Sequence, residues 1–339
     1  MNTYKYTRLK LRPFILALGL GLAFISCSDD DAETGQPTTP TNPAGTRFME
    51  PVFTNTTVSR DIEYGSNTTQ GGIQESLLMD IHVPEGDSAT NRPLVVFVHG
   101  GGFFGGTKGD DFGASSTFFA QAGYVVADIN YRLIDTVGSE EEITEAQLKL
   151  AIIQAVHDLR AAIRFFVADA ANSNTYRVDP DNVFIGGYSA GAVTVLHAAY
   201  LNTIDELSTF NDQNIVDYVN MNGGLQGNSG NDSSTNFTLR GVMNLSGALV
   251  SANLINAEEI PVISFHGTAD TVVPFGTALA EIGNLVVDGS SIIDSRASDV
   301  GVSSTLNPLD GGGHLATIQC NSCVTTDLIA FTFSNLAAQ

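Results

Sequence analysis

Short runs of apolar residues alternate with segments of helical periodicity along this chain of 339 residues. Most of the runs are continuous, as in strands that are buried on both faces of a sheet. Strands of this kind, separated by helices, predict βαβ units and a mostly parallel sheet. We therefore expect an α/β fold in which helices cover both faces of a central sheet. The expected strands are 77–83, 94–98, 124–129, 182–185, 242–245 and 261–265, and the expected helices are 145–168, 190–201 and 324–336.

Composition limits the number of domains and the class of partner. The apolar fraction is 43%, which is sufficient for one large core, and residues 47–339 contain no second linker, so we expect them to form one domain. The formal net charge of −22 argues against nucleic acid or an anionic membrane surface as a partner, because no basic stripe could release counterions. A chain with this charge attracts a neutral molecule more easily than an anionic one. The oligomeric state is not predicted.

Residues 1–26 have the organisation of a signal peptide. Four basic residues precede an apolar stretch, 14–25, that is too short to span a membrane as a helix. The stretch ends at Ser26-Cys27, which resembles a bacterial lipobox, in which the cysteine is lipidated and becomes the mature N-terminus. The alternative is simple secretion, with Cys27 removed or unused. Residues 27–46 are rich in Thr, Pro, Asn and Gly and predict a flexible tether.

An acidic run, 28–33, directly follows Cys27. It resembles the surface-export signal of Bacteroidetes lipoproteins, although a solvated linker would have the same composition. We expect an exported lipoprotein of the outer membrane or cell surface, whose N-terminal lipid is its contact with the membrane. A periplasmic or secreted protein is the alternative.

Two further cysteines, Cys320 and Cys323, form a Cys-x-x-Cys pair. In an oxidising compartment such a pair most often closes a small disulfide, and we expect one here. A redox role would need a thioredoxin-like strand-to-helix context, which the sequence does not indicate. A zinc site would need a second Cys or His pair at ligand spacing, so we expect no metal.

The pentapeptide 187–191, G-Y-S-A-G, lies between the expected strand 182–185 and the expected helix 190–201. It matches G-x-S-x-G, in which the serine occupies a strained turn and its neighbours are small because the strand and the helix approach closely. The helix N-terminus favours negative charge that develops near Ser189. The pattern predicts a nucleophilic serine; a glycine-rich turn with a surface serine is the alternative.

Three more motifs lie in loops around the expected sheet. The ligand of a parallel sheet binds beyond the carboxyl ends of its strands, so we expect these motifs to meet Ser189 at one edge. They are H-G-G-G at 99–102, H-G-T-A-D-T-V-V-P at 266–274 and G-G-G-H at 311–314.

With these motifs placed, the chain resembles the α/β-hydrolase esterases, close to the carboxylesterase and feruloyl or acetyl-xylan esterase-like group. Further matching pieces are N-Y-R at 130–132, D-L-R-A-A at 158–162 and D-P-D-N-V at 179–183. The resemblance implies the α/β-hydrolase fold and hydrolysis of carboxylic esters through an acyl-serine, without a metal or organic cofactor. The Asn- and Ser-rich stretch 203–240 departs from the family pattern, and we interpret it as a small insertion, or lid, near the active site.

The resemblance also assigns the partners of the serine. Asp270 matches the acid of the family motif, and His314 is the one histidine that follows Asp270 in the sequence. The order Ser189, Asp270, His314 is that of the α/β-hydrolases. His266 is interpreted as structural.

The oxyanion donors implied by the resemblance are the backbone N–H groups of Gly101, Gly102 and Ala190. His99 is interpreted as a structural hydrogen-bonding residue. A tethered exported hydrolase meets polymers, so acetyl or feruloyl groups on polysaccharides are the expected substrates, by analogy alone. A serine peptidase or a lipase of the same fold is an alternative, as is a non-catalytic binding module, although such modules usually lose a triad member.

Overall fold

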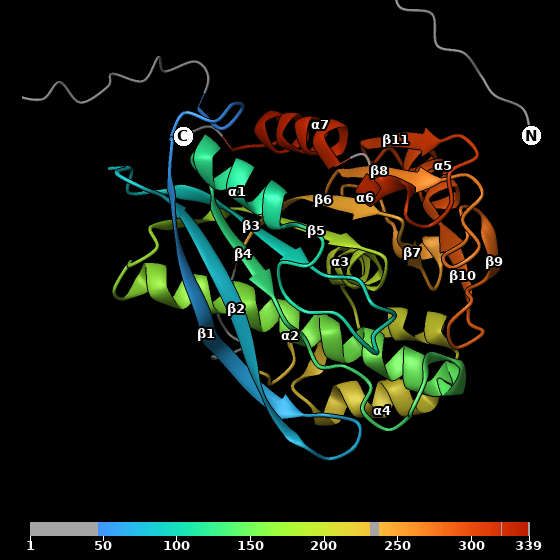
Figure 1. Cartoon of the computed structure of the whole chain (residues 1–339). Coiled ribbons are helices and arrows are strands. Elements are labelled where there is room, and N and C mark those ends of the chain that lie inside the picture. Colours follow the sequence, from blue (N-terminus) through green and yellow to red (C-terminus); the bar gives the residue numbers. More distant parts are fainter. Residues whose placement is uncertain (1–46, 231–236, 320, 338–339) are drawn as a thin grey trace, which may run out of the picture. The chain divides into compact units, whose positions relative to one another are not determined.

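A computed structural model describes residues 47–230, 237–319 and 321–337. They contain an eight-stranded sheet in the order β1-β2-β4-β3-β5-β6-β8-β11 (Figure 1). The six strands from β4 to β11 are parallel, and β2 and then the edge strand β1 extend the sheet in antiparallel pairing. This confirms the mostly parallel sheet. The strands are β1 (Thr56–Thr68), β2 (Gln74–Pro84), β3 (Arg92–Val98), β4 (Val125–Ile129), β5 (Val178–Tyr188), β6 (Leu239–Leu245), β8 (Val262–Gly267) and β11 (Ser304–Leu309).

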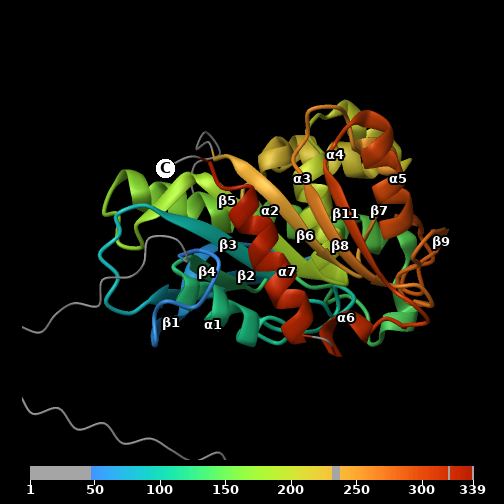
Figure 2. The same ribbon diagram turned by 90° about the horizontal axis from the view of Figure 1, so that it is seen from above.

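Helices cover both faces of the sheet, as expected (Figure 2). Strand β3 shows why its sequence is continuously apolar: Leu94, Val96 and Val98 pack with α2 and α3, whereas Val95 and Phe97 pack with α1 and α7. A strand in the centre of a covered parallel sheet needs apolar side chains in both directions. The helices are α1 (Gly113–Ala122), α2 (Glu145–Ala171), α3 (Ala190–Tyr200), α4 (Gln213–Met221), α5 (Ser290–Val300), α6 (Ala316–Gln319) and α7 (Asn321–Ser334).

The stretch 203–240, interpreted from the sequence as a small insertion or lid, contains regular structure. Most of the described part of 203–240 is helical: α4 lies between the 3₁₀ turns η2 (Asp205–Phe210) and η3 (Gly224–Gln226). Helix α4 begins where the side chain of Asp212 caps the N–H of Asn214, and it packs on α2, where Gln154 Nε2 donates to Tyr218 Oη. Helix α4 and η3 thus cover the outer side of α2, and none of residues 203–230 lines the pocket beside Ser189.

A buried ion pair holds this region together. The guanidinium of Arg132 donates to the carboxylate of Asp158 on α2, with both side chains fully buried. The same guanidinium donates to Thr68 O at the end of β1 and to Ser229 Oγ after η3. One buried cation therefore joins the edge of the sheet, α2 and the segment that covers α2.

A second sheet has three short strands, in the order β7-β10-β9. They are β7 (Ala248–Leu249), β9 (Thr277–Leu279) and β10 (Val286–Gly289). We call residues 277–289, which comprise β9, β10 and the loop between them, the flap. It belongs to the stretch between Asp270 and α5, for which the sequence predicted no element.

Some expectations fall on residues that the structure does not describe. Cys27 and Cys320 lie outside the described residues, as does the side chain of Cys323, so the lipidation and disulfide predictions stay predictions. In the described part of the chain, no helix has the length and apolar character needed to cross a membrane. The 3₁₀ turns not yet given are η1 (Glu140–Glu142) and η4 (Ala252–Leu254).

Candidate active site

Ser189 lies on a strained turn between β5 and α3. Its φ of 53° falls in the left-handed region, which is costly for a residue with a side chain. The glycines on either side allow the turn, because a methyl group on Gly187 would overlap the backbone of Gly191, and one on Gly191 would overlap the carbonyl oxygen of Val98. Strand, helix and the end of β3 are thus packed backbone to backbone, and the serine side chain projects at the carboxyl edge of the sheet.

The structure brings Ser189, His314 and Asp270 together in one chain of hydrogen bonds. His314 Nε2 lies 2.8 Å from Ser189 Oγ, and His314 Nδ1 lies 2.7 Å from Asp270 Oδ2. Asp270 follows β8, and His314 follows the neighbouring strand β11. His314 is 125 positions from Ser189 and 44 from Asp270 in the sequence. The three residues meet because the strands that precede them end at the same edge of the sheet.

Asp270 is held as an ionised acceptor. The N–H groups of Val272 and Val273 donate to Oδ1 at 2.9 and 3.0 Å, while Oδ2 faces His314 and, at 3.3 Å, Nε2 of His266. Burial alone would raise the pKa of Asp270, but the hydrogen bonds from His266 and His314 outweigh it and hold the pKa well below its usual range. The carboxylate is thus charged at neutral pH and can fix the orientation of the His314 ring.

Two contacts position His314 that the sequence analysis did not identify. Tyr188 Oη donates to the carbonyl oxygen of His314 at 3.1 Å, and the two rings are 5.3 Å apart. The loop before His314 is tied to the Asp270 loop by a hydrogen bond from Ala269 N to Gly312 O at 2.9 Å. Tyr188 is the variable second position of the G-x-S-x-G motif, so the motif carried no signal for this role.

Of the three residues expected to donate to an oxyanion, two lie beside Ser189 and one does not. Gly102 and Ala190 line the same pocket as Ser189. Ala190 is the first residue of α3, and the N–H groups of a first helical turn have no partner within the helix. Gly101 does not line the pocket; its carbonyl oxygen accepts from the N–H groups of Phe104 and Gly105, which closes the turn after β3.

The other histidines of the motifs are buried and hydrogen-bonded. His99 stacks on Tyr131 with 4.5 Å between ring centroids, and its Nδ1 contacts Gly100 O at 2.7 Å. Burial lowers the pKa of His99. His266 Nδ1 lies 2.7 Å from Ser290 Oγ, and its Nε2 lies 2.9 Å from Val273 O. His99 supports the glycine loop, whereas His266 is a direct neighbour of Asp270.

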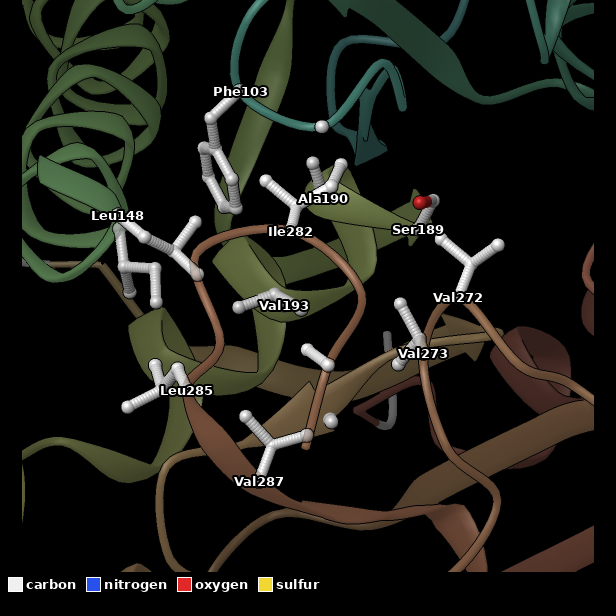
Figure 3. A pocket seen from close by; sticks show the side chains of 14 residues that line it. Phe103, Leu148, Ser189, Ala190, Val193, Val272, Val273, Ile282, Leu285 and Val287 are labelled. Carbon is white, nitrogen blue, oxygen red and sulfur yellow. The ribbon is translucent and has the colours of Figure 1, made fainter. Parts of the chain in front are cut away.

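An apolar pocket opens beside Ser189 and contains about 470 Å³ of empty space, part of it open to solvent (Figure 3). Its floor is α3 and one wall is α2, and the rest is formed by the flap, the Asp270 loop, the glycine loop after β3 and Ala248 of β7. The sequence analysis missed the flap residues, because β9 and β10 are too short to show a periodicity. The lining residues are Gly102, Phe103, Leu148, Ile152, Ser189, Ala190, Val193, Ala248, Val272, Val273, Ala280, Ile282, Leu285 and Val287.

Comparison with known sequences points to esterases. The BD-FAE family model matches residues 79–280. Esterase B1 of Culex pipiens is 30% identical over 129 residues, and the para-nitrobenzyl esterase of Bacillus subtilis (strain 168) is 29% identical over 126 residues. These matches cover 37% and 36% of this chain but 22% and 24% of the two esterases, so the chain spans under a quarter of the curated relatives it matches.

Solved structures share the fold at low sequence identity. A truncated form of a carbohydrate esterase from gut microbiota has a TM-score of 0.56 at 20% identity, covering 82% of this chain and 96% of that one. Esterase 2 of Thermogutta terrifontis, phosphorylated by paraoxon, has a TM-score of 0.58 at 19% identity and covers 83% and 96%. Both likenesses show the α/β-hydrolase fold.

Proposed function

The chain belongs to the BD-FAE family of α/β-hydrolase esterases, and on this premise we propose that it hydrolyses carboxylic esters through an acyl intermediate on Ser189. The observation that carries the proposal is the hydrogen-bonded chain Ser189–His314–Asp270, with distances of 2.8 and 2.7 Å. A nucleophile, a base within reach of its proton and an acid that orients the base are the parts that acyl transfer requires.

The proposed reaction has two halves. His314 Nε2 takes the proton of Ser189 Oγ as the oxygen attacks the ester carbonyl, and then gives it to the departing alcohol. The N–H groups of Ala190 and Gly102, with Gly101 as the third expected donor, stabilise the oxyanion; one such donor is typically worth about 3 kcal/mol of barrier. Water then attacks the acyl-serine while His314 takes its proton, and His314 returns that proton to Ser189 Oγ as the acyl–oxygen bond breaks and the acid leaves. Asp270 stays ionised and stabilises the imidazolium.

The alcohol half of the substrate is proposed to be part of a polysaccharide. The likeness to a carbohydrate esterase from gut microbiota supports this, as does the export expected from residues 1–26. The sequence led us to expect acetyl or feruloyl groups as the acyl half, and the lining of the pocket beside Ser189 bears on that choice.

We also propose that the protein is a surface lipoprotein anchored through Cys27 and tethered by residues 27–46. The basic and apolar organisation of 1–26 and the acidic run 28–33 support this. Expression of the full chain in a Gram-negative host with labelled palmitate should label the wild type and leave Cys27→Ala unlabelled. Label on both proteins, or on neither, would contradict the anchor.

The ester hydrolase proposal is tested with purified residues 47–339. We expect turnover of 4-nitrophenyl esters, and release of acid from acetylated xylan if the alcohol is a polysaccharide. An organophosphate should stop turnover and add its phosphoryl mass to the peptide that contains Ser189, because the reagent reacts with activated serines. Folded protein that turns over peptides but no ester would be a peptidase of the same fold. Protein that turns over neither would be a binding module.

A further inference from the structure

The pocket beside Ser189 lies on the acyl side of the site. Its wall includes Gly102 and Ala190, whose N–H groups face the carbonyl oxygen in the proposed reaction, and it does not include His314, which protonates the leaving alcohol. An ester whose carbonyl carbon contacts Ser189 Oγ therefore directs its acyl half into the pocket and its alcohol half toward His314. This assignment rests on the proposed function.

The side chains of the pocket wall restrict which acyl groups can bind. Of the 14 lining residues, Ser189 alone has a polar side-chain atom, and the others are aliphatic, aromatic or glycine. We propose that the pocket binds an unsubstituted aliphatic acyl chain longer than acetyl, so that the substrates are esters of short- to medium-chain fatty acids. The flap closes this pocket and sets the chain preference.

The depth of the pocket indicates how long the bound acyl chain is. Val193 lies one helical turn after Ser189 on α3, so its Cα is displaced by about 6 Å along the helix axis. Leu148 and Leu285, from α2 and the flap, lie beyond Val193 as seen from Ser189 (Figure 3). An acetyl group would leave most of this apolar surface without contact. A chain of about four to eight carbons would cover it, and each buried methylene would raise kcat/KM about fourfold.

The same wall disfavours a feruloyl group. A feruloyl group has a phenolic hydroxyl and a methoxy oxygen at the end farthest from the ester, which would lie beside Leu148 and Leu285. These side chains have no polar atom, and a buried polar group without a partner lowers binding by about fivefold or more. The cinnamoyl group has the same phenylpropenoyl framework without the hydroxyl and methoxy substituents, so the pair isolates the effect of these two substituents.

The flap forms the pocket wall through one face of β10. Val287 is buried and lines the pocket, whereas its neighbour Val286 is 53% exposed and pairs with Leu279 of β9 on the outer face. This follows from strand geometry, since consecutive side chains point to opposite faces. Ile282, in the loop of the flap, reaches the glycine loop, because a methyl group on Gly102 would overlap its Cδ1.

The first test measures kcat/KM of the wild type for 4-nitrophenyl acetate, butyrate, hexanoate, octanoate, cinnamate and ferulate. We expect hexanoate to exceed acetate by up to about 200-fold, from four added methylenes, and cinnamate to exceed ferulate by about fivefold or more. Acetate or ferulate as the best substrate would overturn the inference and leave the esterase proposal intact. If none of the esters were hydrolysed in a way that depends on Ser189, both the inference and the esterase proposal would be overturned.

The second test uses two neighbouring substitutions on β10. Val287→Thr keeps the size and the branched β-carbon but places a hydroxyl in the pocket, so the ratio of kcat/KM for hexanoate to that for acetate should fall about fivefold. Val286→Thr makes the same chemical change on the outer face and should leave the ratio as in the wild type. Equal ratios in both variants, with unchanged thermal unfolding, would show that β10 does not contact the acyl chain and would overturn the role of the flap.

Discussion

Replacing Ser189 with alanine should lower kcat for ester hydrolysis by about a millionfold, the loss found when the nucleophile of a serine hydrolase triad is removed. The substitution deletes one hydroxyl from a residue whose φ of 53° alanine tolerates no worse than serine. The ring of His314 stays in place, because Asp270 and Tyr188 hold it independently of the serine. The fold should therefore survive, and the variant should still bind the substrate. Initial rates with 4-nitrophenyl hexanoate, together with thermal unfolding, measure both quantities.

Ser246 offers a matched control for Ser189. It too follows a parallel strand, β6, has a positive φ of 56° and lies beside His314, where its Oγ is 3.4 Å from the carbonyl oxygen. Ser246→Ala removes a hydroxyl near the same histidine without removing the nucleophile, so kcat should change by less than about tenfold. If the two alanine variants had similar rates, the nucleophile would lie elsewhere.

The reactive residues could be predicted because each motif is local and each lies at a strand end. G-Y-S-A-G at 187–191 is complete within one turn, and a parallel sheet brings the ends of its strands to one edge. Asp270 and His314 were assigned through the resemblance of their segments to the family motifs and through their order after Ser189 in the sequence. The details that the turn requires, such as the contact of Gly191 with Val98, depend on neighbouring strands and are invisible in one sequence.

The flap and the segment on α2 could not be predicted, because their signals are short. Strands β9 and β10 have three and four residues, fewer than a period-2 pattern needs to stand out. In α4 only Ile215 and Val219 are buried, and this i, i+4 pair is surrounded by Asn and Asp, so the sequence shows little helical periodicity there. Strand β1 is an edge strand with one buried residue, so it too lacks an apolar pattern.

The pairing of buried charged residues also could not be predicted from the sequence. Arg132 and Asp158 were both noted as parts of family-like segments, yet nothing in a linear pattern says that two charges 26 positions apart meet. Their pairing depends on the crossing of α2 behind the sheet. Removing one member of such a fully buried pair would leave an uncompensated charge, which typically costs about 3 to 5 kcal/mol of stability.

Replacing Asp270 with asparagine should lower kcat by about ten thousandfold, as expected when the orienting acid of a triad becomes an amide. The carboxylate accepts from two backbone N–H groups through Oδ1 and faces both His314 and His266 through Oδ2. An asparagine has one acceptor oxygen, so its NH₂ group would face a ring N–H and favour the wrong tautomer of His314. Asp310→Asn, an exposed change in the loop before His314, is the matched control and should leave kcat unchanged.

The same substitution should change how stability depends on pH. Because the folded state holds the pKa of Asp270 below its unfolded value of about 3.9, the ionised carboxylate stabilises the fold at higher pH. That contribution is lost as the pH falls through the lower folded value. The difference in unfolding free energy between the wild type and Asp270→Asn should therefore be constant above about pH 5 and should shift against the wild type below about pH 4. Urea unfolding from pH 3 to pH 7 measures it, and a difference that did not vary with pH would mean that Asp270 is not held ionised by His314 and His266.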